Sequence, residues 1–222
     1  MPTAPPPVRP VTLDEIRAAR ERIRNVATRT PLVRLRHDAA APEIWLKLET
    51  LQPINAFKIR GAANAVAMLS PQERARGVWT ISAGNAGQGV AYAARQAGIP
   101  CTVVVIETAA ETKVERMRNL GARLVKAPFD ACWKAMEQRQ FPGVEGTFVH
   151  PFDDHDFVAG NATIGLEILE DLPDVKTVIA GIGGGGLISG VGSSIRQLAP
   201  KVRILGAEPE TAAPGAASFA AG

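Results

Sequence analysis

The sequence predicts an α/β protein whose parallel sheets are covered by helices, and two observations carry this prediction. From Gly77 onward, short apolar runs rich in β-branched residues alternate with helical segments, and residues 101–106 have the composition of a buried strand. Glycine-rich turns join strand to helix at residues 82–88 and 181–187. Because crossovers between parallel strands are right-handed, doubly wound layers are the simplest topology for this order of elements.

The composition is that of an ordinary globular protein and argues against several classes of function. The 222 residues suffice for one large or two small domains, with 46% apolar and 21% charged residues. The net charge of +3 comes from scattered basic residues without interleaved aromatic side chains, so we expect no nucleic-acid partner. Since no apolar run approaches the length of a membrane span, we expect no membrane association.

Cysteine usage favours a cytoplasmic protein. Cys101 and Cys132 show neither CxxC nor metal-type spacing, and no secretory apolar segment precedes them. A reducing compartment is the default for such a chain. His150 and His155 stand close together in an apparent loop, where we expect two histidines without a metal ion.

The first part of the chain is expected to hold two helices and two extended segments. Thr12 and Glu15 have the spacing of a capping box, which opens the first helix, and Lys58 opens the second. In order, the expected elements are a helix over 12–25, an extended segment over 30–35, a strand over 44–48, a helix over 58–69 and a short helical turn from residue 70.

The rest of the chain repeats strand, turn and helix. The expected strands cover 78–81, 101–106, 122–125, 147–149, 177–180 and 202–206, and the expected helices cover 87–96, 112–120, 130–139, 161–169 and 187–198. After the last strand we expect no further helix before Gly222, which would leave the second sheet unfinished.

Lys58 is the first candidate for chemistry, because it stands on an apolar turn at the start of a predicted helix. Pro53 precedes the turn, Phe57 lies beside the lysine, and the small residues 61–65 follow it. A lysine that loses water in such a place has a lowered pKa and can act as an amine nucleophile or a base. A surface lysine that merely opens a helix is the alternative for Lys58 taken alone.

The second candidate is the loop 181–187, whose residues 183–186 are four consecutive glycines. Without Cβ atoms in the way, their N–H groups can converge on a phosphate at the N-terminus of the next helix. A tight strand-to-helix turn needs only one or two glycines, so we favour a phosphate site. No Walker lysine follows, which argues against nucleoside-triphosphate hydrolysis. A dinucleotide site with Glu208 as the ribose ligand stays open.

The third candidate is the loop that begins at Ser82. A hydroxyl, the amide of Asn85 and unhindered N–H groups at Gly84 and Ala86 suit a small carboxylate, although Ser82 could simply cap the next helix. Together the three sites offer an amine nucleophile, a phosphate cradle and a carboxylate cradle. That set is what pyridoxal phosphate requires to act on an amino acid.

With these residues in place, the chain resembles the fold-type II pyridoxal-phosphate enzymes, and among them the threonine/serine dehydratases (threonine ammonia-lyases) and serine racemases. The resemblance runs from about Thr12 to Glu210. Its landmarks stand in family order at Lys47–Glu49, Leu51–Pro53, Phe57–Ala62, Ser82–Asn85, Gly87–Gln88, His150–Asp153, Thr163–Glu167, Gly183–Leu187 and Gly206–Pro209. The ordered set is far more specific than any one motif.

The resemblance implies two doubly wound parallel-sheet domains of the tryptophan-synthase-β-like architecture. The large domain would combine residues 1–60 with 150–222, and the small domain would cover 61–149. Relatives continue for about another domain's worth of chain, so the large domain would be incomplete and the chain would lack its C-terminal part. The resemblance also implies a homodimer or a higher homo-oligomer.

The resemblance implies a role for each candidate residue. Lys58 would be the Schiff-base lysine of pyridoxal 5'-phosphate, Phe57 would pack beside the cofactor ring, and Asn85 would hydrogen-bond the phenolic oxygen. The phosphate would be held by Gly183, Gly184, Gly185, Gly186 and Leu187. The substrate carboxylate would be held, chiefly through backbone N–H groups, by Ser82, Gly84, Asn85 and Ala86.

The implied reaction is β-elimination of L-threonine, L-serine or a related 3-hydroxy amino acid to a 2-oxo acid and ammonia. Such a lyase would serve amino-acid metabolism, in isoleucine biosynthesis or serine catabolism. Racemases of the family tend to have a second serine where Ala83 stands, which favours dehydration. Glu208 matches a cation ligand of some relatives, but Pro214 stands where they have a carboxylate, so we expect no metal.

Other departures keep alternatives open. Ala56 and Ala86 stand where family members usually carry serine and histidine. The alternatives are an amino-acid racemase of the same family, a catalytically defective truncated homologue with a binding or regulatory role, and a nucleotide-binding α/β protein that uses only the loop after residue 180.

Overall fold

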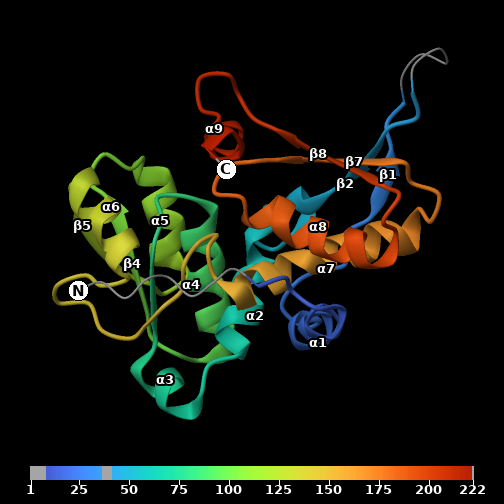
Figure 1. The fold of residues 1–222 in the computed structure, drawn as a ribbon. Helices are drawn as coiled ribbons and strands as arrows, with labels where there is room; N and C mark the ends of the chain where they lie inside the picture. The colour runs from blue at the N-terminus through green and yellow to red at the C-terminus, as the bar shows by residue number, and fades with distance from the viewer. Residues whose placement is uncertain (1–8, 37–41, 222) are drawn as a thin grey trace.

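The computed structural model describes residues 9–36 and 42–221, and it confirms the α/β class (Figure 1). The helices are α1 (Leu13–Ile23), α2 (Lys58–Ala67), α3 (Pro71–Arg76), α4 (Asn85–Ala97), α5 (Glu111–Asn119), α6 (Phe129–Gln138), α7 (His155–Asp171), α8 (Gly186–Leu198) and α9 (Pro214–Ala221), with a 3-10 turn η1 at Glu49–Leu51. The strands are β1 (Leu32–Arg34), β2 (Trp45–Lys47), β3 (Val78–Ile81), β4 (Cys101–Ile106), β5 (Arg123–Ala127), β6 (Thr147–Phe148), β7 (Thr177–Gly181) and β8 (Arg203–Ala207). Most bounds agree closely with the sequence-based prediction.

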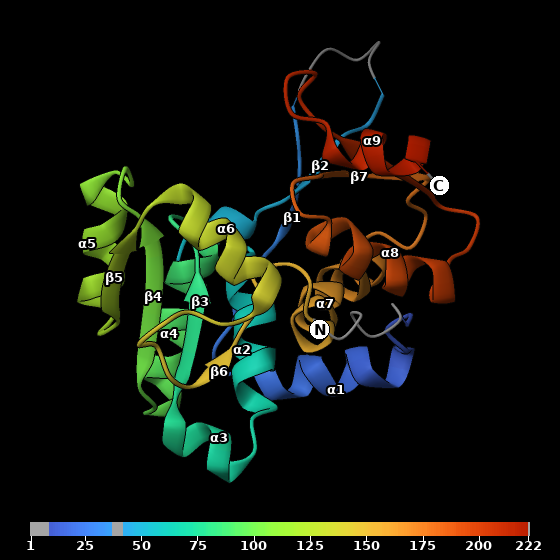
Figure 2. The ribbon, with the colours of Figure 1, turned by 60° about the vertical axis from the view of Figure 1, so that its left-hand side comes forward.

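A four-stranded parallel sheet in the order β5-β4-β3-β6 forms the first layered unit. In the central strand β3, Val78 pairs with Cys101 of β4 on one side and with Thr147 of β6 on the other. Figure 2 shows the four strands side by side in this order. The run of valines in β4 is buried, as predicted for a strand covered on both faces.

Helices cover both faces of this sheet. On one face, Val78 and Val103 pack with α4 and with Met117 of α5. On the other face, Trp79 packs in a separate cluster with Cys132 of α6. Because successive residues of a strand point to opposite faces, neighbours in β3 reach different helices. Figure 2 shows α6 in front of the sheet and α4 behind it, which is the doubly wound arrangement that the sequence predicts.

The second unit pairs β7 with β8 in parallel and packs one face of this pair on α7 and α8. Val178 is buried in that core, whereas its neighbour Ile179 is 67% exposed on the opposite face. The strands β1 and β2 pair antiparallel, which the expectation of parallel sheets did not include. Residues 35–44 join them, and so short a connection favours an antiparallel pair over a crossover.

Helix α2 lies between α4 and α7, and glycines let the backbones touch (Figure 1). A Cβ atom on Gly61 would lie 2.2 Å from the ring of Phe157, and one on Gly160 would lie 2.3 Å from the carbonyl oxygen of Arg60. On the other side of α2, a Cβ atom on Gly89 would lie 3.1 Å from the carbonyl oxygen of Lys58. These contacts fix the position of α2 between the two units.

The predicted start of α7 is wrong. The helix begins at His155, ahead of the expected start at Asn161, so His155 belongs to a helix and not to a loop. The reason is a side-chain cap, because the Oδ1 atom of Asp154 accepts the N–H group of Phe157 at 2.8 Å. This capping residue was not recognised in the sequence.

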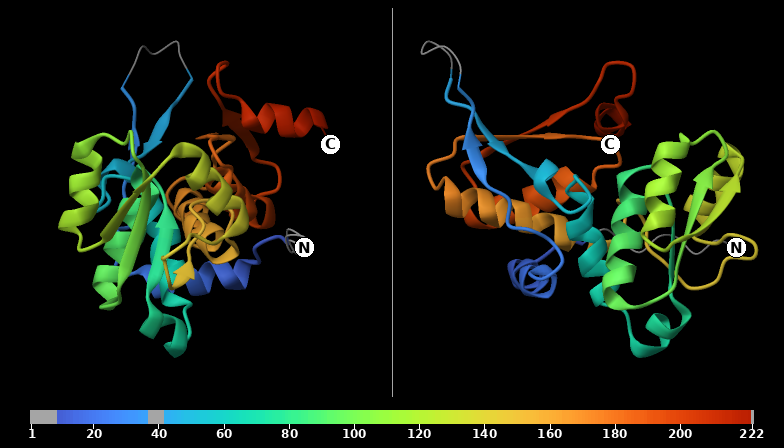
Figure 3. Two further views of the ribbon diagram at one scale, coloured as in Figure 1. Left: turned by 90° about the vertical axis from the view of Figure 1, so that its left-hand side faces the viewer. Right: turned by 180° about the vertical axis from the view of Figure 1, so that it is seen from behind.

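The expectation that no helix follows the last strand is also wrong. The chain turns after β8 and forms α9, drawn in red in both views of Figure 3. Glu208 stabilises the start of this helix, since its carboxylate oxygens accept the N–H groups of Gly215 at 2.7 Å and Ala216 at 2.9 Å. Pro214 opens the helix at a position where proline is favoured.

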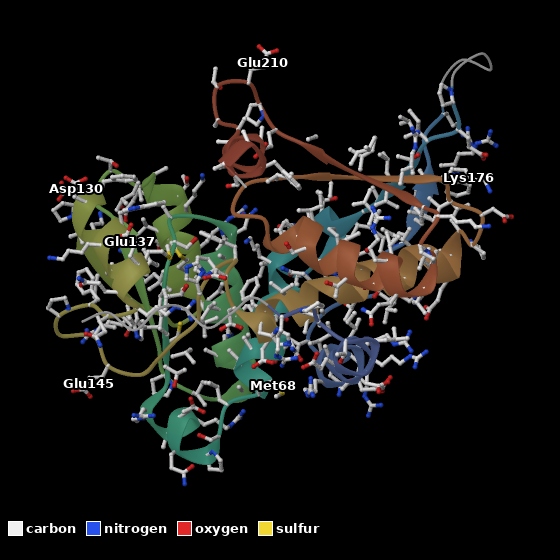
Figure 4. The ribbon with its side chains drawn as sticks, viewed as in Figure 1. Met68, Asp130, Glu137, Glu145, Lys176 and Glu210 are labelled. Atoms are coloured by element: carbon white, nitrogen blue, oxygen red, sulfur yellow. The ribbon has the colours of Figure 1, made fainter. Side chains whose placement is uncertain are left out.

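Charged side chains surround both units. Asp130 and Glu137 project from α6, Glu145 lies in the loop before β6, and Lys176 precedes β7 (Figure 4). None of the helices in the part of the chain that the structure describes combines the length and the apolar character needed to cross a membrane.

The contact between α2 and α7 predicts a specific stability defect. We expect Gly160→Ala to lower the free energy of unfolding by about 1–3 kcal/mol, because the new methyl group would press on the Arg60 carbonyl. The matched control is Gly192→Ala in α8, where the nearest atom, in Ile204, is 3.8 Å away. Chemical denaturation of both variants measures the difference, and equal stabilities would contradict the proposed packing.

Candidate active site

Lys58 is the first residue of α2, and its amine points to the segment between β6 and α7. The Nζ atom donates to the carbonyl oxygen of Pro151 at 2.6 Å. It lies 5.3 Å from the ring centre of Phe57 and 5.4 Å from that of Phe157. Burial lowers the pKa of the Lys58 amine to about 8. A substantial neutral fraction therefore exists near physiological pH, as a nucleophile or base requires.

The Ser82 loop leads from β3 into α4, which begins at Asn85 with Gly84 as its N-cap residue. The N–H group of Ser82 donates to Val104 at 3.0 Å, and the Oγ atom of Ser82 accepts the N–H group of Gly84 at 3.1 Å. Two of the four N–H groups expected to hold a carboxylate are thus used inside the protein. The first helical turn, from Asn85 and Ala86, supplies the remaining donors. Ser82 shapes the loop and does not cap the helix.

The glycine loop leads from β7 into α8, and the structure changes the argument for it. Gly185 is the N-cap residue and has a φ of +83°. A Cβ atom on Gly184 would lie 2.2 Å from the ring of Phe152, and one on Gly186 would lie 2.8 Å from the Phe152 carbonyl oxygen. Conformation and packing therefore already explain three of the four glycines, so the reasoning that four exceed the needs of a turn is wrong.

Two observations still favour an anion at this loop. Around Gly183, no described atom lies within 4 Å of the place that a Cβ atom would take, and the residue is exposed. The N-terminus of α8 has no side-chain cap among the described residues, so its N–H groups point to an open space with favourable charge. Leu187 follows in the first turn and packs its side chain into the core of the second unit.

The three candidate sites are joined by direct contacts. The backbone of Lys58 touches α4 at Gly89, which lies one turn beyond the Ser82 loop. The amine of Lys58 bonds to Pro151, and the adjoining Phe152 packs on Gly184 of the glycine loop. The fold therefore gathers the amine, the carboxylate loop and the glycine loop around the N-termini of three helices, α2, α4 and α8.

Asn161 of α7 lies beneath the start of α8 and is fully buried. Its Nδ2 atom donates to the carbonyl oxygen of Gly186 at 3.2 Å. Its Oδ1 atom is the buried side-chain polar atom that lacks a hydrogen-bond partner within the described residues. An unpaired buried oxygen is costly, so this atom marks a place where a bound group or a water molecule completes the structure.

A buried cluster of charges anchors α2 on the side away from the Lys58 amine. Arg60 is 1% exposed. Its guanidinium donates to both carboxylate oxygens of Glu49, at 2.8 and 2.9 Å, and to both of Glu167, at 2.7 and 2.9 Å. It also reaches Thr163 and the carbonyl oxygen of Thr28, each at 3.1 Å. All five donor hydrogens of the guanidinium thus point at acceptors.

Lys47 completes this charge cluster. Its Nζ atom lies 2.6 Å from Glu167 and 2.6 Å from the carbonyl oxygen of Thr30. Thr30 and Gln52 in turn donate to Glu49. Two buried cations therefore face two buried carboxylates, and the cluster ties together the segment before β1, the turn η1 and the helices α2 and α7.

Glu208 is not placed to bind a ribose or a cation, because both of its carboxylate oxygens accept N–H groups of α9. This corrects the dinucleotide alternative, which depended on that carboxylate. His155 bonds to Glu15 at 3.1 Å, while the Nδ1 atom of His150 accepts backbone N–H groups, so the two rings serve different parts of the fold. Within residues 9–36 and 42–221, no group of three His, Cys, Asp or Glu side chains could hold a metal ion.

A family model for pyridoxal-phosphate dependent enzymes matches residues 23–222, which is most of the chain. The chain belongs to this family. Among its curated relatives, the L-threonine ammonia-lyase of Thermotoga maritima is 45% identical over 204 residues, covering 90% of this chain and 51% of that protein. The chain thus spans about half the length of this relative.

Solved structures of the family have the same fold. Maize serine racemase superimposes with a TM-score of 0.86 at 33% identity, over 96% of this chain and 66% of the racemase chain. A bacterial structure described as T.th. threonine deaminase gives a TM-score of 0.84 at 33% identity, over 95% and 69% of the two chains. These likenesses confirm the fold-type II architecture with an incomplete second unit, and the resemblance to threonine dehydratases and serine racemases.

The residues present fit pyridoxal phosphate, the cofactor of this family. Lys58 offers a partly neutral amine, as a carbonyl cofactor requires. The open space at Gly183 and the uncapped N-terminus of α8 suit a phosphate group. The unpaired Oδ1 atom of Asn161 lies under the same helix.

Sequence reasoning gave no role to several residues that shape the site. Pro151 and Phe152 were seen only as a family landmark, and Phe157 and Asn161 only as parts of a helix. The signal for Phe157 was the glycine pair Gly61 and Gly160, since two glycines inside helices indicate a close helix contact. The role of Pro151 rests on a backbone carbonyl, for which a sequence carries no signal.

The environment of Lys58 predicts its reactivity. The neutral amine reacts and the ammonium does not, so a pKa of about 8 means that labelling rises between pH 7 and pH 9. Reductive methylation across pH, followed by mass spectrometry of the Lys58 peptide, measures the midpoint. The exposed Lys176 serves as the internal reference. A midpoint above pH 10 for Lys58 would contradict the role of burial.

The charge cluster predicts a large loss of stability when its centre is removed. We expect Arg60→Met to lower the free energy of unfolding by about 3–5 kcal/mol, because Glu49 and Glu167 would stay buried without their partner. The control is Arg118→Met, whose partners Glu111 and Glu115 are exposed, and which should leave stability nearly unchanged. Urea denaturation followed by circular dichroism compares the two.

Proposed function

We propose that this chain carries the catalytic lysine and the cofactor cradle of a pyridoxal-phosphate-dependent ammonia-lyase. The substrate would be L-threonine, L-serine or a related 3-hydroxy amino acid, and the products a 2-oxo acid and ammonia. The observation that supports this most is the partly neutral Lys58 amine, joined by contacts to both an open glycine loop and an uncapped helix. The likeness to the L-threonine ammonia-lyase of Thermotoga maritima supports the substrate class.

We propose the following roles for the site residues. Lys58 would bind the cofactor aldehyde, with Phe57 beside the ring and Asn85 near its phenolic oxygen. The phosphate would lie at Gly183, Gly184, Gly185, Gly186 and Leu187. The substrate carboxylate would lie at Asn85 and Ala86, with Ser82 and Gly84 shaping that loop.

The chain's own residues explain how proton transfer could proceed. Bound pyridoxal phosphate supplies an electron sink for charge that develops at the substrate α-carbon. Lys58, when neutral, can accept a proton at Nζ, and the carbonyl oxygen of Pro151 orients the amine through one N–H group. The rings of Phe57 and Phe157 keep water from the amine, which holds the pKa in a useful range.

A racemase is the second candidate, and the likeness to maize serine racemase favours it. Racemisation needs a proton donor on the face of the substrate opposite Lys58. Ala83 offers only a methyl group where racemases of the family tend to have a serine, so we place dehydration first. Formation of D-serine from L-serine would reverse this order.

We further propose the domain division that the resemblance implies, with residues 61–149 as the small domain and 1–60 with 150–222 as the large one. The four-stranded sheet lies within the first range, and β1, β2, β7 and β8 lie within the second. We also propose a cytoplasmic homo-oligomer that serves isoleucine biosynthesis or serine catabolism. Two free cysteines, Cys101 and Cys132, support the reducing compartment.

A cofactor-trapping experiment tests the proposed function. Borohydride added to the chain with pyridoxal phosphate should fix the cofactor on the Lys58 peptide, as read by mass spectrometry. Lys58→Ala should abolish this label and lower 2-oxo acid formation by about 10²–10⁴-fold or more. Lys176→Ala, at an exposed position, is the matched control.

The outcomes separate the alternatives. Cofactor fixed on Lys58 together with pyruvate or 2-oxobutyrate would support the lyase. Cofactor fixed on Lys58 without any 2-oxo acid would favour the catalytically defective homologue. Cofactor fixed on a different lysine would contradict the site.

A further inference from the structure

His150 is a buried histidine that the roles above do not use. It ends the chain segment after β6 and is only 5% exposed. The rings of Phe148 and Phe152 contact it edge-on, at centroid distances of 5.7 and 4.5 Å. A polar ring in so apolar a place needs a structural or chemical reason.

The hydrogen bonds of His150 show which ring nitrogen carries the proton. Its Nδ1 atom accepts the N–H group of Asp153 at 2.8 Å and that of Phe152 at 3.3 Å. An accepting Nδ1 atom leaves the proton of the neutral ring on Nε2. The imidazole therefore folds the next residues, 151–153, into a tight turn around itself.

This turn carries two contacts of the proposed site. The carbonyl oxygen of Pro151 accepts the Lys58 amine at 2.6 Å. Phe152 fills the space beside Gly184 and Gly186 of the glycine loop. One turn thus supports both the amine and the phosphate loop, and its shape depends on the ring of His150.

We propose that His150 is a positioning residue, whose Nδ1 atom holds the turn 151–153 and thereby sets both the Lys58 amine and the glycine loop for the cofactor. This inference rests on the roles proposed above for Lys58 and the glycine loop. Burial lowers the pKa of His150 to about 4, so the ring stays neutral and able to accept at neutral pH. The charged groups that act on it are Asp153, Arg139 and Lys58.

Two substitutions separate the acceptor from the bulk of the ring. His150→Phe keeps a ring of similar size but has no acceptor, whereas His150→Asn places its Oδ1 atom where Nδ1 stood. We expect His150→Phe to weaken pyridoxal phosphate binding by about tenfold, as for the loss of two hydrogen bonds, and to shift the pH midpoint of Lys58 methylation. His150→Asn should restore both to within about threefold of the unchanged chain.

The control is His155→Phe, which loses a bond to Glu15 but leaves the turn intact. Unchanged cofactor affinity and an unchanged Lys58 profile in folded His150→Phe would overturn the proposal, and so would an Asn variant as impaired as the Phe variant. If His150→Phe does not fold, the Asn variant and the tautomer decide. A chain that binds no cofactor at all would defeat the proposed function, while the Lys58 profile would still test His150.

The tautomer can be read in the unchanged chain. Nitrogen-15 NMR of the histidine side chains, with the His150 signals assigned by their loss in His150→Asn, should show a neutral ring protonated at Nε2 at neutral pH. A ring protonated at Nδ1, or an imidazolium, would overturn the proposal without recourse to any change in binding.

Discussion

The buried ion cluster around Arg60 is the interaction on which the rest of the structure depends. It fixes α2, and α2 carries the proposed nucleophile two residues earlier. Since residues two apart on a helix point about 200° away from each other, Arg60 can face the cluster while Lys58 faces the site. Anchoring on one face thus defines the direction of the amine on the other, and the glycine contacts with α4 and α7 remove the remaining freedom.

The three buried cations of this region differ in their partners, and the partners decide their chemistry. Arg60 and Lys47 face carboxylates, so burial leaves both charged and structural. Lys58 has a carbonyl oxygen and aromatic rings around its amine, and no carboxylate pairs with it within the described residues. Burial without a counter-charge is what lowers its pKa. The same helix therefore holds one cation for stability and another for reactivity.

Local patterns predicted most of the fold, because the strands and helices of the first layered unit have clear periodicity and glycine punctuation. The misplaced start of α7 and the missed α9 depended on single carboxylates, Asp154 and Glu208, that cap helix ends. Within the candidate site, Lys58 could be picked out by residue type and place. The contributions of Pro151 and His150 could not, because they rest on a carbonyl oxygen and on a turn whose contacts span distant segments.

The bond between Lys58 and Pro151 has a consequence for evolution and for engineering. Its acceptor is a main-chain oxygen, which every residue type possesses, so no single exchange of the side chain at position 151 deletes it. Mutational drift can therefore alter the surface of this segment while the partner of the amine persists. A designer who wishes to retune the lysine must reshape the path of the backbone and cannot simply swap a neighbouring group.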